Sequence, residues 1–172
     1  MDYIKTIDDI KNHAAKWNPS NILVDTIEEA SDNINFPHED YPLHVNSTIL
    51  AITHTVDILR ERNLTENDIR FIHKVCMKEK EFLQLGQWRT GEVIVNQVLC
   101  PPQPYLISPY MMSILPVGLE FQKTNDEILN WFKEFETIHP FEDGNGRVGG
   151  VVLAAMTFLL NDKFLVPKKF KK

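Results

Sequence analysis

His-Pro-Phe-Glu-Asp-Gly-Asn-Gly-Arg, residues 139–147, is followed directly by an apolar run over residues 148–160. A run of that length and composition predicts a buried helix, so the nine residues before it form the turn that opens the helix. A glycine-rich turn at the beginning of a helix presents free backbone N–H groups and the positive end of the helix dipole. The sequence therefore predicts a cradle for phosphate groups at this turn.

The residue types within the turn fit the chemistry of a nucleotide site. Gly144 and Gly146 can adopt positive φ and let a ligand approach the backbone closely. Arg147, in the first helical turn, can donate charge-assisted hydrogen bonds to a phosphate oxygen. Asp143 is a hard oxygen ligand of the kind that Mg²⁺ accepts alongside substrate phosphates. His139 could take a proton from an attacking hydroxyl, so the turn predicts a nucleotide site with a base beside it.

The same stretch closely resembles the signature of the Fic family, nucleotidyl transferases that usually move AMP onto protein hydroxyls. The family pattern is H-P-F-x-[D/E]-G-N-G-R-x-x-R, and this sequence matches every fixed position except the last, where Gly150 stands in place of arginine. The resemblance implies a mainly α-helical fold, a Fic-type helical bundle with a small β-hairpin flap over the active-site loop.

A second segment carries the same resemblance. β-branched runs on both sides of Asn96-Gln97 suggest a small β-hairpin, which prolines end after residue 100. The segment from Gly86 follows the family pattern G-x-[FW/Y]-R-x-x-x-V-x-V, then P-P, of the flap. In the family the flap edge holds the target peptide by strand addition, a role that would fall to Val93, Ile94 and Val95. An ordinary edge hairpin is the alternative interpretation.

The resemblance also implies a role for the residues of the motif. His139 would deprotonate a Ser, Thr or Tyr hydroxyl of a target protein, and that oxygen would attack the α-phosphate of ATP, with pyrophosphate leaving. Asp143 would hold Mg²⁺ between the phosphates. Phe141 would be the buried anchor of the loop. The phosphates would be bound by Gly144, Asn145, Gly146 and Arg147.

Gly150 is the departure from the family pattern that bears on activity. The family arginine at this position grips the γ-phosphate, and its loss would remove about 1.5–3 kcal/mol of binding or positioning. That is roughly one to two powers of ten in rate or affinity. Two alternatives follow: phosphocholine transfer from CDP-choline, which has no γ-phosphate, and a nucleotide- or protein-binding module that has lost turnover.

Many members of the family also carry an inhibitory helix of the type [S/T]-x-x-x-E-[G/N], whose glutamate pairs with the arginine that is missing here. The nearest stretch in this chain is residues 46–51, with Leu50 where the glutamate would stand. We therefore expect this chain to lack that form of self-inhibition, with no carboxylate lying against the phosphate loop.

The rest of the chain predicts a helical domain with an N-terminal extension. Residues 1–45 are expected to form an extension packed on the core, and residues 46–172 the Fic-type domain. Ser47 is expected to cap a helix, and Thr65 begins a near capping box. His54 and His73 are expected to be structural or exposed. Helices are expected over residues 8–17, 25–31, 47–62, from residue 66, over 108–120 with a break at Pro116, and over 125–138.

Composition limits the class of protein. With 43% hydrophobic and 24% charged residues the chain is typical of a globular protein, and its net charge of −6 argues against a nucleic-acid binder. Cys76 and Cys100 lack metal-like spacing and predict reduced thiols. The N-terminus lacks the apolar core of a signal peptide, and no run reaches the roughly 18–20 residues of a membrane span. We expect a cytoplasmic protein, or an effector exported by a dedicated system, with a nucleotide and a target protein as partners and neither nucleic acid nor membrane.

Overall fold

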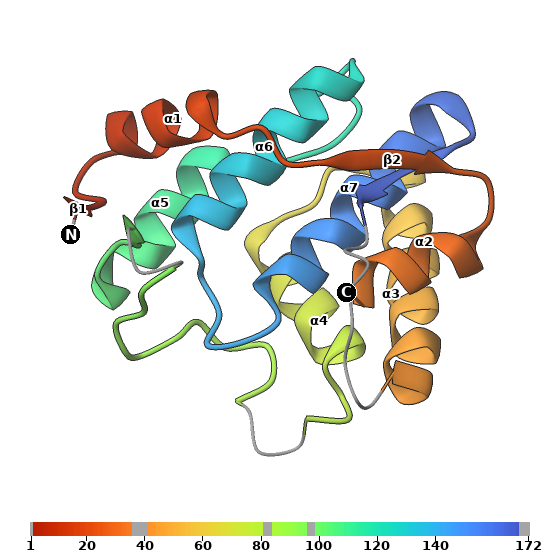
Figure 1. Ribbon diagram of the computed structural model, residues 1–172, viewed down its shortest axis with the longest axis horizontal. Helices are drawn as coiled ribbons and strands as arrows, with labels where there is room; N and C mark the ends of the chain where they lie inside the picture. The colour runs from red at the N-terminus through yellow and green to blue at the C-terminus, as the bar shows by residue number, and fades with distance from the viewer. Residues whose placement is uncertain (1, 36–40, 81–83, 96–98, 169–172) are drawn as a thin grey trace.

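Figure 1 shows the computed structural model, which describes residues 2–35, 41–80, 84–95 and 99–168. The predicted mainly α-helical fold is confirmed. The helices are α1 (Ile7–Lys16), α2 (Ile27–Asn35), α3 (Tyr41–Glu61), α4 (Glu66–Cys76), the 3-10 turn η1 (Pro104–Leu106), α5 (Ile107–Ile114), α6 (Asn125–Ile138) and α7 (Asn145–Asn161). The strands are β1 (Asp2–Tyr3), β2 (Asn21–Val24), β3 (Leu99–Cys100) and β4 (Phe164–Pro167).

Helix α7 is the centre of the core, as its apolar composition predicts. It contacts α2, α3, α4, α6 and β4, and Figure 1 shows it between α6 and the pair α3 and α4. Every residue from Arg147 to Thr157 is buried. Two glycines permit close packing at its N-terminal half: a Cβ on Gly149 would lie 2.5 Å from Glu136 Oε1 of α6, and one on Gly150 would lie 3.2 Å from Ile34 Cγ1 of α2. The phosphate turn is therefore held by neighbouring helices on both sides.

Local sequence signals fix two helix starts as predicted. Thr65 caps α4, and its backbone N–H donates to Asp68 Oδ2 at 2.8 Å. Thr124 caps α6, where its hydroxyl oxygen accepts from the backbone N–H of Glu127 at 3.1 Å. These side chains satisfy N–H groups that the first turn of a helix leaves without a partner. Helix α6 then runs to Ile138 and delivers the chain to His139.

Helix α3 corrects two predictions. It begins at Tyr41, so Ser47 lies inside the helix, 1% exposed, and does not cap it. The sequence around Pro42 predicts a surface connection, but proline is tolerated in the first turn of a helix, where no backbone N–H is needed. Helix α2 likewise runs on to Asn35. The predicted boundary between residues 45 and 46 falls within α3, and the division into domains stays a prediction.

Two small sheets tie distant parts of the chain together. Strands β2 and β4 pair antiparallel, with Asn21 opposite Pro167 and Val24 opposite Phe164, while β1 and β3 pair in parallel. The predicted flap hairpin is present at one point: Val95 and Leu99 form an antiparallel bridge, and residues 96–98 lie outside the described residues. Val93 and Ile94 belong to no strand, which corrects their assignment to a strand.

No helix within the described ranges is long and apolar enough to cross a membrane. Both cysteines are buried and carry free thiols.

Candidate active site

The turn between α6 and α7 has a backbone of unusual conformation. His139 ends α6 with φ 53° and ψ 61°, in the left-handed region, and Gly144 precedes α7 with φ 87°. The side chain of Asn145 closes the turn: its Oδ1 accepts from the Phe141 N–H and its Nδ2 donates to the Phe141 carbonyl, both at 2.8 Å. Both polar atoms of this side-chain amide are thus engaged within the turn.

His139 lies in the wall of a cavity of about 740 Å³. Desolvation, and after it the positive charge of Arg89, lower the pKa of its imidazole to about 4, although a hydrogen bond to the Glu136 backbone and the charge of Asp143 act in the opposite direction. The ring is therefore neutral at neutral pH. A neutral imidazole whose one nitrogen donates to a backbone carbonyl has an acceptor left on the other nitrogen, as a general base requires.

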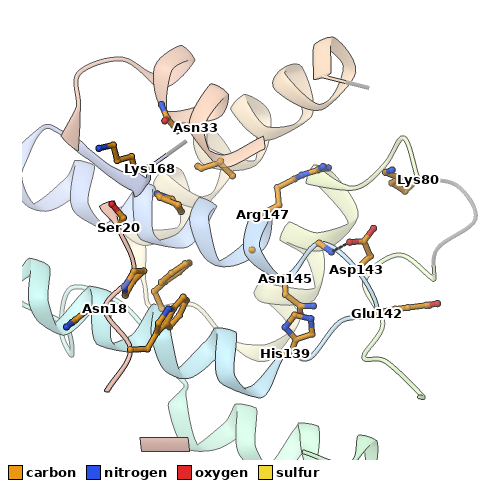
Figure 2. A pocket seen from close by; sticks show the side chains of 17 residues that line it. Asn18, Ser20, Asn33, Lys80, His139, Glu142, Asp143, Asn145, Arg147 and Lys168 are labelled. Carbon is orange, nitrogen blue, oxygen red and sulfur yellow. Dashed lines mark hydrogen bonds between the residues drawn. The ribbon is translucent and has the colours of Figure 1, made fainter. Parts of the chain in front are cut away.

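The cavity has two ends, which Figure 2 shows on opposite sides. At one end lie His139, Asp143 and the N-terminus of α7 with Gly146 and Lys80. This end offers backbone N–H groups and positive charge, the features that bind phosphate.

The far end of the cavity is formed by segments remote in sequence. The connection between α1 and β2 contributes Trp17, Asn18 and Ser20. The Trp17 ring stacks on Phe132 of α6 with centroids 5.9 Å apart. Pairing of β2 with β4 brings Lys168 alongside, where its N–H donates to the Ser20 carbonyl at 2.8 Å. An aromatic wall edged by amide and hydroxyl groups is suited to a flat polar ring such as a nucleobase.

The structure places Phe141 at the centre of an aromatic cluster beneath the turn. It is fully buried, stacked on His73 at 4.0 Å between centroids and tilted against Trp88 at 5.0 Å. His73 also bonds the turn directly: its Nδ1 accepts from the Gly86 N–H at 2.9 Å, so its Nε2 donates to the Asp143 carbonyl at 3.0 Å. Burial lowers the pKa of His73. His73 is therefore a structural histidine of the site, a role its helical spacing alone did not reveal.

Arg147 is held by the C-terminal end of α4. Its Nη1 donates to the Cys76 carbonyl at 3.0 Å, to Met77 Sδ at 3.1 Å and to Glu79 Oε1 at 2.9 Å, and its side chain is 5% exposed. The prediction that no carboxylate lies against the phosphate loop is wrong, because Glu79 does. The prediction rests on residues 46–51, where Leu50 is 53% exposed on α3, whereas Glu79 follows the end of α4.

Gly150 faces α2, and the Ile34 side chain occupies the space next to it. A Cβ at this position would lie 3.2 and 3.3 Å from two carbons of Ile34. That contact is tighter than ordinary packing even for a single methyl group, so any side chain at this position requires the Ile34 side chain to move. The missing arginine is thus matched by an apolar residue packed over the same turn of α7.

The donor set fits one kind of metal site. Within the described part of the chain there is no group of three or more His, Cys, Asp or Glu side chains that could hold a metal ion. Asp143 lines the cavity, and its Oδ1 accepts from the Gly144 N–H at 2.8 Å. A single carboxylate next to a phosphate cradle suits Mg²⁺, which is commonly held by one or two carboxylates together with substrate phosphates and water.

Comparison with known proteins agrees with this geometry. A family model of the Fic/DOC family matches residues 63–158. Over 91 residues the chain is 35% identical to a protein of Aquifex aeolicus (strain VF5) named "Probable protein adenylyltransferase", a match that covers 49% of this chain and 28% of that protein.

Two solved structures share the fold. One is a Fic domain containing signaling protein from Bacteroides thetaiotaomicron VPI-5482, with a TM-score of 0.55 and 19% identity over 69% of this chain and 48% of that one. The other is a Fic family protein from Desulfovibrio desulfuricans G20, with a TM-score of 0.53 and 19% identity over 78% of this chain and 45% of that one. The match spans less than half the length of each of these three relatives.

Proposed function

This chain belongs to the Fic/DOC family, and from that premise we propose that it transfers AMP, or another nucleotide monophosphate, from a nucleoside triphosphate to a Ser, Thr or Tyr hydroxyl of a target protein. One observation carries the proposal. The imidazole of His139, neutral at neutral pH, and the N-terminus of α7 line the same cavity. A base and an anion cradle in one cavity are what nucleotidyl transfer to a hydroxyl requires.

The proposed reaction balances with the groups at hand. His139 accepts the proton of the target hydroxyl as its oxygen forms a bond to the α-phosphorus. The bond from the α-phosphorus to the bridging oxygen breaks, and pyrophosphate leaves with that electron pair. The low pKa of His139 keeps the acceptor nitrogen available at neutral pH. The left-handed backbone at His139 sets the direction from which the ring faces the cavity.

The remaining residues of the turn would bind the phosphates. Backbone N–H groups at the N-terminus of α7 and the exposed Gly146 would face the phosphate oxygens, and Lys80 supplies positive charge at the same end. Asp143 would hold Mg²⁺, which when bound offsets the charge of the phosphates. Arg147 would bind a phosphate if its ion pair with Glu79 breaks. If the ion pair stays intact, Arg147 would contribute by holding α7 in place.

The test is the intact mass of the purified protein after incubation with Mg²⁺ and one donor at a time. The donors are ATP, GTP, CTP, UTP and CDP-choline, each run beside the His139→Ala variant. Self-modification gives a readout without a known target. We expect an added nucleotide monophosphate that is absent in the variant. If no donor adds mass, and calorimetry shows no nucleotide binding, the proposal is wrong. Binding without added mass would indicate a nucleotide-binding module.

A second candidate is phosphocholine transfer from CDP-choline, and the packing at Gly150 favours it. A donor without a γ-phosphate does not require the arginine whose place Ile34 covers. In this case the mass experiment yields an added phosphocholine, and ATP yields none. The two candidates thus differ in the mass that is added and in the donor that adds it.

A further inference from the structure

Arg89 lies where the flap segment meets the turn that carries His139. Its side chain comes from the segment just before the flap, and the residue is 4% exposed. Its backbone N–H donates to the Pro140 carbonyl at 2.8 Å. Among the described residues, its guanidinium donates hydrogen bonds to backbone carbonyls. These acceptors are His139 at 2.6 Å, Pro102 at 2.6 Å, Gly91 at 3.0 Å and Ile138 at 3.3 Å.

This arrangement is costly for a charged group. No salt bridge to Arg89 is present among the described residues, and Glu92 is the charge that acts on it from a distance. Burial lowers the pKa of the guanidinium to about 10, which leaves it charged at neutral pH. A buried cation without a carboxylate contributes little to stability compared with an apolar residue of the same size. A planar fork of five donors, however, is what several converging carbonyls need, and only arginine supplies it.

The carbonyls that Arg89 joins belong to two functional parts. Ile138, His139 and Pro140 are three successive residues of the catalytic turn, and His139 holds a left-handed conformation that is unfavourable for a non-glycine residue. Gly91 and Pro102 are the two ends of the flap segment. The Arg89 side chain therefore holds both ends of the flap segment and the backbone of His139.

We propose that Arg89 is a positioning residue that fixes the flap relative to His139, so that a target chain held on the flap presents its hydroxyl to the imidazole. The part played in transfer rests on the proposed function, whereas the coupling of the flap to the turn is a property of the fold. Arg89 is not among the residues that line the 740 Å³ cavity. We therefore expect its replacement to affect transfer to the hydroxyl more than donor binding.

The test compares Arg89→Lys with Arg70→Lys in the full chain. Lysine keeps the charge at position 89 and loses the fork. Arg70 is a matched control, because its Nε also donates to a backbone carbonyl of the neighbouring segment, that of Gly86 at 2.7 Å, without contacting His139. Each variant is assayed for rate of self-modification, for donor Kd by calorimetry, and for amide hydrogen exchange in peptides covering residues 84–95, 136–142 and 148–160.

For Arg89→Lys we expect the rate to fall by about 10- to 100-fold, because a displacement of about 1 Å at the reacting group costs roughly that much. Donor Kd should change by less than about twofold. Exchange should become faster at residues 84–95 and 136–142 and stay as in the wild type at residues 148–160. Arg70→Lys should match the wild type in rate, in donor Kd and in exchange at residues 136–142 and 148–160.

An unchanged rate in Arg89→Lys would overturn the proposal. So would a parallel loss of donor affinity with faster exchange at residues 148–160, which indicates a general structural role. If Arg89→Lys does not fold, Arg89→Gln is measured in the same way, and failure of both to fold also overturns the proposal. Absence of transfer in the wild type would refute the proposed function alone, since the exchange measurements still test the coupling.

Discussion

Glu136, one turn before His139 on α6, makes the stability of the protein depend on pH in a way that can be measured. Its carboxylate oxygen Oε1 is buried and has no hydrogen-bond partner among the described residues. It packs against α7, 2.5 Å from where a Cβ of Gly149 would lie. Burial raises the pKa of this carboxyl from 4.5 to about 8, so the folded protein holds Glu136 as a neutral acid at neutral pH.

The direction of the effect follows from proton linkage. Below pH 4.5 the carboxyl is protonated in both the folded and the unfolded chain and contributes nothing. Between pH 4.5 and about 8 the unfolded chain loses this proton and the folded chain keeps it, so stability falls as the pH rises. At about 1.4 kcal/mol per pH unit, the loss is roughly 3 kcal/mol at pH 7 and at most roughly 5 kcal/mol above pH 8.

Glu136→Gln removes the titration while keeping the shape of the side chain. Because the residue as a whole is only half-buried, water would reduce the effect, and we expect a gain of about 2–4 kcal/mol at pH 8. For a chain of this size that corresponds to roughly 5–15 °C in Tm. The assay is thermal unfolding followed by circular dichroism at pH 5, 6, 7 and 8.

The decisive quantity is the difference in Tm between Glu136→Gln and the wild type at each pH. We expect it to grow from pH 5 to pH 8, and subtraction removes the contributions of other groups such as His139, whose lowered pKa acts in the opposite direction. The exposed Glu28→Gln controls for loss of one negative charge, since surface substitutions usually change stability by less than about 0.5 kcal/mol. A difference that stays constant with pH would refute the reasoning.

Three further substitutions test contacts around the phosphate turn. Glu79→Gln removes the carboxylate that pairs with Arg147. Because that carboxylate repels phosphate, calorimetry should show a donor Kd lowered by about 3- to 10-fold. An unchanged Kd would contradict this. Gly144→Ala puts a side chain at φ 87° and 2.7 Å from a buried methionine sulfur, so urea unfolding should show a loss of roughly 1–3 kcal/mol, and a loss near zero would count against it. Gly150→Arg should lower Tm by several degrees, and adding Ile34→Ala should recover part of the loss if their contact is the cause.

The phosphate turn and the helix after it could be predicted from sequence because their signals are local. Glycines at fixed spacing followed by an apolar run indicate a turn and a buried helix over a few residues. The contacts that complete the site are not local. Arg147 and Glu79 are 68 residues apart in the chain, and Arg89 and His139 are 50 apart. No regular spacing in the sequence indicates that either pair is in contact, so the contacts are visible only in the folded chain.

The start of α3 shows a different limit. Pro42 among polar residues suggests a loop, yet the same proline is compatible with the first turn of a helix. Packing against α2, α4 and α7 decides between these conformations, and packing is a property of the whole fold. Local preference is weak enough for such contacts to override it.

The pairing of β2 with β4 makes the two ends of the chain part of the binding cavity. The part of the cavity wall near Ser20 and Lys168 forms only while residues 21–24 and 164–167 are paired as antiparallel strands. A donor bound in the cavity would therefore stabilise the pairing of β2 with β4, because a ligand stabilises any state to which it binds.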